Sequence, residues 1–149
     1  MPRLEKLHPN DSATLAQIEQ AEHLFFEGSS FEEDQWQGDV YTLTVNDAII
    51  GYAIFGQVHL PESKVGFITR VAVYPQYRRQ GYGRFMVHTA VKKMFEAGSP
   101  YIYAGILKSN RASKTMFAQC GWHPFEELGY EFEQEVDPKY DWVAIERQP

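Results

Sequence analysis

The sequence has few of the residues that build disulfides, metal centres and membrane spans. Its one cysteine, Cys120, permits no disulfide within the chain, which suits a reducing compartment. The five histidines are scattered and form no cluster with cysteine at metal-ligand spacing, so we expect no metal site. No apolar run is long enough to cross a bilayer, and the first residues lack the apolar stretch of a secretion signal. These absences predict a cytoplasmic protein without a membrane partner.

The sequence also has fewer basic than acidic residues. The chain has 14 Lys and Arg against 20 Asp and Glu, a formal net charge of -6. We expect no nucleic-acid partner, because binding to phosphates along a strand needs a broad basic face. The acidic residues gather in two clusters, which are Glu19, Glu22, Glu27, Glu32, Glu33 and Asp34, and Glu126, Glu127, Glu131, Glu133, Glu135 and Asp137. With 149 residues, 44% of them hydrophobic, the composition predicts a single domain over residues 1–149.

The most informative segment runs from Val71 to Gly83, where an apolar strand gives way to a helix. Backbone N–H groups at a helix start have no partner within the helix, and the helix dipole adds partial positive charge there. Gly81 and Gly83 let a ligand approach the backbone. Three arginines, Arg78, Arg79 and Arg84, add cationic side chains. The segment therefore predicts a phosphate-binding loop.

This loop differs from two common phosphate-binding motifs. It has no Gly-Lys-Ser/Thr as in the nucleotide-binding P-loop, and it lacks one of the three glycines of the dinucleotide fingerprint. Its pattern is Arg-x-x-Gly-x-Gly over residues 78–83, preceded by Val-x-Pro. A second segment, residues 110–122, begins with an asparagine, and either Ser109 or Asn110 can cap the helix. That helix has an apolar stripe and ends at Gly121 before an aromatic residue.

Together the two segments resemble the motifs of the GNAT N-acetyltransferases, and the resemblance covers nearly the whole chain. It implies an α/β mixed sheet of six to seven strands with four helices, in which two central parallel strands splay apart. It also implies an N-acetyltransferase that moves an acetyl group from acetyl-CoA to a primary amine of a small molecule or a peptide, by direct attack of the amine on the thioester.

The order of predicted elements agrees with that fold. Apolar periodicity and turn residues predict strands at Arg3–Leu7, Val40–Val45, Ala48–Val58, Val65–Val73, Tyr101–Leu107 and Trp142–Arg147, with one less clear strand within Trp122–Gln134. Helices are predicted after Asn10, at Phe31–Gln37, up to Ala97 and within the second motif.

The resemblance also implies roles for particular residues. Backbone groups of Val71 and Val73 would bind the pantetheine, and the N–H of Val71 would polarise the thioester carbonyl. The loop would hold the pyrophosphate, and Asn110 would reach the cofactor from the second helix. The implied cofactor-binding set is Val71, Ala72, Val73, Arg78, Arg79, Gln80, Gly81, Tyr82, Gly83, Arg84, Asn110 and Phe117.

At three positions the chain departs from the family pattern. Phe117 stands where many members have a tyrosine acid, and Thr69 and Gly105 stand where a glutamate base is often found. Three explanations remain open. Water with Tyr103 or Tyr130 could transfer the protons, since alternation places Tyr103 on the Gly105 face of its strand. The thiolate could leave unassisted, or the chain could bind acyl-CoA without turnover. The catalytic candidates are thus Val71, Tyr103 and Tyr130.

The acceptor side of the family is built from its early helices and late loop. Here those segments hold both acidic clusters and several aromatic residues, a combination that favours a cationic amine with an apolar part. The same residues also fit solvated glutamates and core aromatics. Protein N-termini, polyamines, amino sugars and amino acids remain open as acceptors, while the acidic surface disfavours aminoacyl-tRNA. The length of the acyl group is open, as is a homodimer through a late edge strand.

Overall fold

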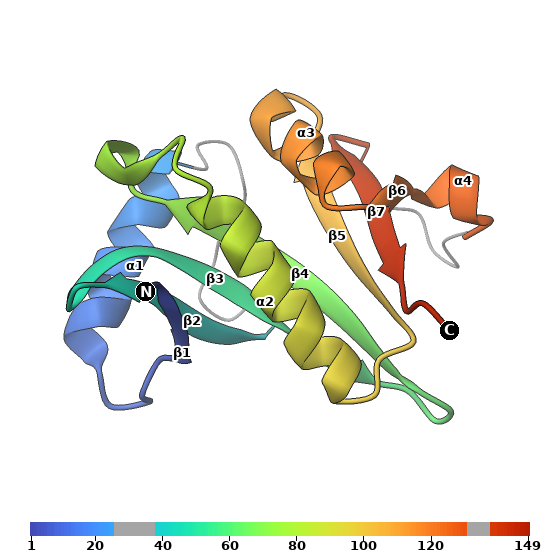
Figure 1. Cartoon of the computed structure of the whole chain (residues 1–149), viewed down its shortest axis with the longest axis horizontal. Coiled ribbons are helices and arrows are strands. Elements are labelled where there is room, and N and C mark those ends of the chain that lie inside the picture. Colours follow the sequence, from blue (N-terminus) through green and yellow to red (C-terminus); the bar gives the residue numbers. More distant parts are fainter. Residues whose placement is uncertain (26–37, 131–137) are drawn as a thin grey trace.

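The computed structural model describes residues 1–25, 38–130 and 138–149, and its strands form one sheet in the order β1-β2-β3-β4-β5-β7-β6 (Figure 1). The strands are β1 (Arg3–Lys6), β2 (Asp39–Val45), β3 (Ala48–His59), β4 (Lys64–Val73), β5 (Tyr101–Leu107), β6 (His123–Pro124) and β7 (Tyr140–Glu146). The helices are α1 (Ser12–Phe25), α2 (Tyr82–Glu96), α3 (Arg111–Gln119) and α4 (Phe125–Leu128), with a 3₁₀ turn η2 (Pro75–Tyr77) before α2. The expected mixed α/β sheet is confirmed.

The first four strands pair antiparallel with their neighbours in sequence. Asn46 and Asp47 join β2 to β3 with φ values of 49° and 66°. Two central residues in the left-handed region make a tight turn whose twist matches that of the strands, which explains why this Asn-Asp pair forms a hairpin.

The centre of the sheet opens where β4 meets β5. These two strands are parallel and pair only at Gly66↔Ile102, Phe67↔Tyr103 and Ile68↔Ala104. On the other edge of β4, the register with β3 shifts, so that Ile54 faces Arg70 while Phe55 faces Ile68, and Thr69 is the extra residue of a β-bulge. An extra residue bends a strand and increases its twist. The bulge at Thr69 therefore coincides with the point at which β4 leaves β5.

Helices cover both faces of the sheet, because side chains along each strand alternate between two apolar clusters. On one face α1 packs against the sheet in a cluster made of Ile18, Ala21, Tyr52, Ile54 and Ala72. On the other face α2 and α3 pack in the larger cluster, which includes Ala53, Phe55, Ile68, Met86, Val87, Ala90 and Phe117. In Figure 1, α2 lies across β3 and β4 on that second face.

Local capping fixes the helix ends that the sequence predicts. The carboxylate of Asp11 accepts a hydrogen bond from the N–H of Thr14 at 3.0 Å, which caps α1. At α3 the cap is Asn110, not Ser109, since Asn110 Oδ1 accepts from the N–H of Ser113 at 3.1 Å. Gly121, the predicted helix stop, has a φ of 91°.

The late part of the chain differs from the prediction. The strand expected within Trp122–Gln134 is only the two-residue β6, and the helix α4 follows it at once. Gly129, with a φ of 75°, ends that helix. Residues 131–134 of this prediction lie outside the described residues, as does the predicted helix Phe31–Gln37. Within the described part, no helix is long and apolar enough to cross a membrane.

Candidate functional site

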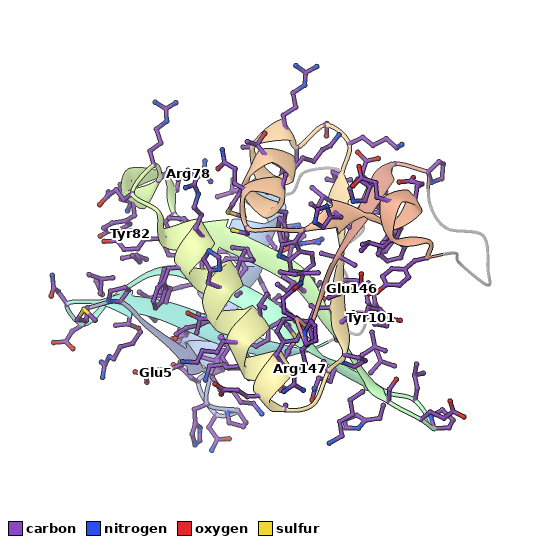
Figure 2. All side chains as sticks on the ribbon, turned by 45° about the vertical axis from the view of Figure 1, so that its right-hand side comes forward. Glu5, Arg78, Tyr82, Tyr101, Glu146 and Arg147 are labelled. Carbon is purple, nitrogen blue, oxygen red and sulfur yellow. The ribbon has the colours of Figure 1, made fainter. Side chains whose placement is uncertain are left out.

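A groove lies between the start of α2 and the neighbouring α3, and we call it the loop groove. It has a volume of about 620 Å³. Its lining joins the end of β4, the loop and both helices through Val71, Val73, Tyr77, Arg78, Arg79, Gly81, Tyr82, Gly83, Arg84, Ala112, Ser113 and Met116. Eight of the residues predicted to bind the cofactor thus meet in one groove, and Figure 2 shows Arg78 and Tyr82 at this end of the molecule.

Unpaired backbone donors face this groove. The first bond within α2 runs from the N–H of Phe85 to the carbonyl of Gly81, at 3.1 Å, so the amides of Tyr82, Gly83 and Arg84 have no carbonyl four residues back in the helix. Gly81 has a φ of 84°, a conformation that strains most other residues. A Cβ atom added at Gly83 would lie 2.8 Å from Met116 Sδ, so the glycine permits the close approach of α2 to α3.

The free edge of β4 presents its backbone to the same groove. The N–H of Tyr74 bonds to the carbonyl of Ile50 in β3, at 2.9 Å. The carbonyl of Val73 instead points away from β3, where it accepts a hydrogen bond from Arg78 Nε at 2.9 Å. Because backbone groups alternate along a strand, those of Val71 point the same way as those of Val73. The N–H and C=O of Val71 therefore face the opening between β4 and β5.

A small cavity, which we call the central cavity, lies in the opening between β4 and β5. Its volume is about 40 Å³, and it is lined by Ile68, Thr69, Arg70, Val71, Ala104, Gly105, Ile106, Leu107, Asn110, Ser113, Phe117 and Tyr140. Val71 and Ser113 also line the loop groove, so the two hollows adjoin.

A third hollow opens from the opposite face of the sheet, and we call it the aromatic pocket. Its volume is about 200 Å³, and it is lined by Phe67, Ile68, Thr69, Arg70, Tyr103, Gly105, Tyr140 and Trp142. Five of these residues also line the central cavity. The three hollows therefore adjoin one another from the loop groove to the face of the sheet on which α1 packs, and we call this series of hollows the passage.

A buried ion pair holds the one charged residue among the described lining of the aromatic pocket. Arg70 Nε donates to Glu22 Oε2 at 2.9 Å, and the side chains are 13% and 0% exposed. The Tyr52 hydroxyl donates to the other oxygen of Glu22 at 2.7 Å. Burial and the neighbouring Glu22 carboxylate raise the pKa of Tyr52 far above its usual value, so this hydroxyl stays protonated. Glu22 thus lies inside the fold, and its place in an exposed acidic cluster was predicted wrongly.

The three positions that depart from the family pattern meet at the central cavity. Thr69 forms the bulge, and Phe117 is buried against Trp122 with ring centroids 4.8 Å apart. Gly105 pairs with Trp142, and a Cβ atom at Gly105 would lie 2.9 Å from two carbons of that indole ring. Trp142 therefore covers the space that a side chain at position 105 would need.

The two tyrosines singled out from the sequence lie in different places. Tyr103 lines the aromatic pocket, and burial raises its pKa above the usual value. Tyr130 instead packs against Tyr101 with the rings tilted and their centroids 4.9 Å apart, and it hydrogen-bonds to Glu146. Burial raises the pKa of Tyr130 to about 12, and Glu146 contributes to the shift. Figure 2 shows Tyr101 and Glu146 together, away from Arg78 and Tyr82. Tyr130 is not among the lining residues of the three hollows.

Tyr140 is a site residue that the sequence reasoning missed. It lines both the central cavity and the aromatic pocket, because the pairing of β5 with β7 sets it opposite Leu107. That register depends on contacts between distant parts of the chain, and no local motif signals it. Of the other predicted residues, Asn110 and Phe117 line the central cavity, Ala72 packs its side chain toward α1, and Gln80 is exposed.

No group of His, Cys, Asp and Glu within the described ranges could hold a metal ion. The lysines of the site are exposed and paired with one carboxylate, Asp141, whose oxygens lie 3.2 Å from Lys108 Nζ and 2.7 Å from Lys114 Nζ. These contacts join the end of β5, α3 and β7 beside the central cavity.

The sequence of this chain is similar to that of one protein family. The chain matches the sequence model of the Acetyltransferase (GNAT) family over residues 10–122. It is 26% identical over 125 residues to the [Ribosomal protein bS18]-alanine N-acetyltransferase of Escherichia coli K12, covering 83% of this chain and 82% of that protein.

Two solved structures show the same fold. A Bacillus subtilis acetyltransferase in complex with CoA has a TM-score of 0.71 and 18% identity, covering 99% of this chain and 100% of that one. Arabidopsis thaliana Naa50, in complex with the bisubstrate analogue CoA-Ac-MVNAL, has a TM-score of 0.70 and 13% identity, covering 96% of both chains.

Proposed function

Because the chain belongs to the GNAT family of acetyl-CoA-dependent N-acetyltransferases, we propose that it acetylates a primary amine of a small molecule or a peptide within the passage through its sheet. The observation that carries the proposal is the sharing of residues among the three hollows. One substrate enters from the loop groove, the other from the aromatic pocket, and they meet at Val71. This arrangement suits direct transfer without a covalent enzyme intermediate.

The residues of the loop groove fit a diphosphate-bearing cofactor. Three amides at the start of α2 and the side chains of Arg78, Arg79 and Arg84 line or adjoin the groove, and both features attract phosphate. A Cβ atom built at Gly81 would meet nothing within 4 Å, which leaves open space over the backbone there. When bound, acetyl-CoA supplies an acetyl group activated as a thioester.

In this proposal, backbone groups of β4 position the bound acetyl-CoA. The edge of the strand that faces away from β3 offers the backbone groups of Val71 to an extended ligand, as an added strand would use them, and the carbonyl of Val73 would join them once Arg78 releases it. Val71 lines the central cavity, and its N–H would stabilise negative charge on a carbonyl oxygen there. Asn110 already uses its Oδ1 to cap α3, so its role is to fix the helix beside the cavity.

Proton transfer in this proposal uses tyrosine and water. No carboxylate is found among the described residues that line the central cavity or the aromatic pocket. Tyr103 and Tyr140 are the hydroxyl-bearing aromatic residues of these two hollows, and the raised pKa of Tyr103 keeps its proton in place at neutral pH. We assign the role of acid to one of these two tyrosines and the role of base to water.

An amine of low basicity suits a site without a carboxylate base. The α-amino group of a peptide has a pKa of about 7.7–8.0, against about 10.4 for a lysine side chain, so a larger fraction of it is neutral at pH 7. The curated E. coli relative acts, by its name, on an alanine of ribosomal protein bS18. A peptidyl α-amine is therefore the first acceptor to examine.

The test is release of the CoA thiol from acetyl-CoA with a panel of amines, together with mass spectrometry of the acetylated product. The panel holds short peptides with free N-termini, small monoamines, polyamines and amino sugars. We expect acetylated product with at least one class and a loss of turnover when Tyr103 and Tyr140 are both changed to phenylalanine. Binding of CoA by calorimetry without product from any amine would contradict the proposal.

A further inference from the structure

We propose that the aromatic pocket selects an acceptor whose amine is joined to an aromatic ring by a short chain, and that Trp142 is the residue that determines this specificity. The inference rests on the proposed transfer through the passage and names the chemistry of the acceptor. Its evidence is the lining of the pocket, the pairing of its charged residue and the contact between Trp142 and Gly105.

The rings of the pocket form one continuous wall. Phe67 and Tyr103 have centroids 6.2 Å apart, Tyr103 and Trp142 lie at 6.2 Å, and Trp142 and Tyr140 at 6.1 Å. Another aromatic ring can bind to such rings in offset or edge-on geometry. Phe125 extends the wall, with its centroid 6.3 Å from that of Trp142.

The described lining of this pocket holds no carboxylate that would select an ammonium group. The one charged residue among its described lining is Arg70, which is itself positive and is bonded to buried Glu22. A second cation on the acceptor would therefore meet no carboxylate in this lining and would lie near a guanidinium. Recognition by an apolar ring is the interaction that the lining offers.

Trp142 also limits the size of the pocket, because its ring occupies the space beside Gly105. Its ring lies 2.9 Å from where a Cβ of residue 105 would stand, so the indole takes the place of a side chain on β5. The pocket that remains has about 200 Å³, below the roughly 300–1,000 Å³ of pockets for drug-sized ligands. It suits a group the size of one aromatic side chain, with the amine directed at the central cavity that the pocket adjoins.

Two sources could supply this chemistry, and the experiment separates them. One arm compares phenethylamine with cyclohexylethylamine, which has the same number of carbons but a saturated ring, and with spermidine. The other compares the peptide Phe-Ala-Ala with Ala-Ala-Ala. We expect a kcat/KM for the aromatic member of at least one arm that is several-fold above its saturated or alanine counterpart, and about tenfold or more above spermidine. The arm that shows the preference identifies a free arylalkylamine or a peptide N-terminus.

The variants test whether Trp142 is responsible. Trp142→Leu should reduce the preference for the aromatic member to nearly one, and Trp142→Phe should retain most of it. Tyr101→Leu is the matched control, because Tyr101 lies on the same strand face as Tyr103 but outside the pocket. Thermal unfolding of each variant verifies that the fold is kept.

Binding is measured separately, so that failure of the inference differs from failure of the proposed function. Saturation-transfer NMR reports whether the ring protons of phenethylamine contact CoA-loaded protein, and whether that contact is lost in Trp142→Leu. Trp142-dependent binding without product would support the pocket and contradict the transferase proposal. Turnover without an aromatic preference in either arm, a preference that survives Trp142→Leu, or the absence of both binding and aromatic preference would overturn the inference.

Discussion

At the scale of single residues, the contact between Trp142 and Gly105 shapes the candidate site. Gly105 stands where related enzymes often have a glutamate, and the structure gives a physical reason for the glycine. A Cβ atom there would approach the Trp142 ring to 2.9 Å, with a third ring atom at 3.2 Å. The two residues therefore constrain each other, and a glutamate at position 105 alone would displace the indole of Trp142.

This constraint gives a double-mutant prediction. Gly105→Glu should lower the free energy of unfolding by about 1–3 kcal/mol, because the new side chain overpacks the contact with the indole. In the background of Trp142→Ala the same change should cost clearly less, and the double variant should gain an acidic limb in its pH–rate profile. Urea unfolding of the four proteins in the cycle measures the coupling. Additive effects within about 0.5 kcal/mol would show that the two positions are independent.

At the scale of elements, local patterns predicted more than long-range ones did. The loop at residues 78–83 and the helices that follow both motifs are encoded by glycine, capping and apolar spacing within a few residues, and these features are confirmed. The strand expected within Trp122–Gln134 is present only as the two-residue β6, because Phe125–Leu128 forms a helical turn closed by Gly129. The splay between β4 and β5 was expected only from the family resemblance.

Residues whose roles depend on distant contacts could not be found in the sequence. Glu22 reads as part of an acidic cluster, yet its partners Tyr52 and Arg70 lie 30 and 48 residues away along the chain and keep it buried. Tyr140 reaches the central cavity only through the register of β7 on β5. The sequence pattern does not contain the pairing of Glu22 with Tyr52 and Arg70, so charge and spacing predicted the wrong environment for Glu22. It also does not contain the register of β7 on β5, so it did not single out Tyr140.

The contact between α2 and α3 should control the loop groove. Gly83→Val adds a side chain where Met116 Sδ would lie 2.8 Å from the Cβ, so the helices must separate or the new side chain must enter the groove. We expect the dissociation constant of CoA, measured by calorimetry, to rise at least tenfold. Met116→Ala should restore part of the affinity by making room.

A substitution at Gly81 should destabilise the protein by a different mechanism from Gly83→Val. Gly81 has a φ of 84° and open space around its Cβ position, so Gly81→Ala should cost about 1–2 kcal/mol of stability through backbone strain rather than through a clash. Met116→Ala should give no rescue there. Equal rescue at both positions would argue against a specific contact between Gly83 and Met116.

An ion-pair cluster joins three elements beside the cavity and should make stability depend on pH. Hydrogen bonds from Lys114 and then Lys108 hold the pKa of Asp141 below its usual value. A carboxyl whose pKa is lowered by folding contributes stability above its unfolded pKa of about 3.9 and loses that contribution as pH falls through its folded pKa. Because the lysines are largely exposed, the contribution is no more than about 1 kcal/mol.

The check compares Asp141→Asn with the original chain in urea unfolding. The variant should be less stable at pH 7 and also at pH 5, and the difference should shrink below about pH 4 as Asp141 takes up its proton. High salt at pH 7 should reduce it as well. A difference that stayed constant down to pH 3 would point to packing rather than charge as its cause.

At the scale of the whole molecule, charge is divided between an acidic body and a basic loop. The chain has a net charge of -6, while Arg78, Arg79 and Arg84 line one groove. The described lining of the aromatic pocket, by contrast, holds the single charged side chain of Arg70, which is paired with Glu22. The two ends of the passage should therefore respond differently to ionic strength.

The resulting prediction separates the two substrates by their salt dependence. Interactions between exposed charges are screened over roughly 8 Å at physiological ionic strength, so the KM for acetyl-CoA should rise several-fold as salt is increased from low to physiological levels and beyond. The KM for an uncharged-ring monoamine should change little, because burial of an aromatic ring is not weakened by salt. Arg79→Gln should flatten the dependence for acetyl-CoA and leave the amine unaffected. Steep salt dependence for the amine instead would mean that acidic residues steer a cationic acceptor to the pocket, and the aromatic wall would then be secondary to charge in choosing the substrate.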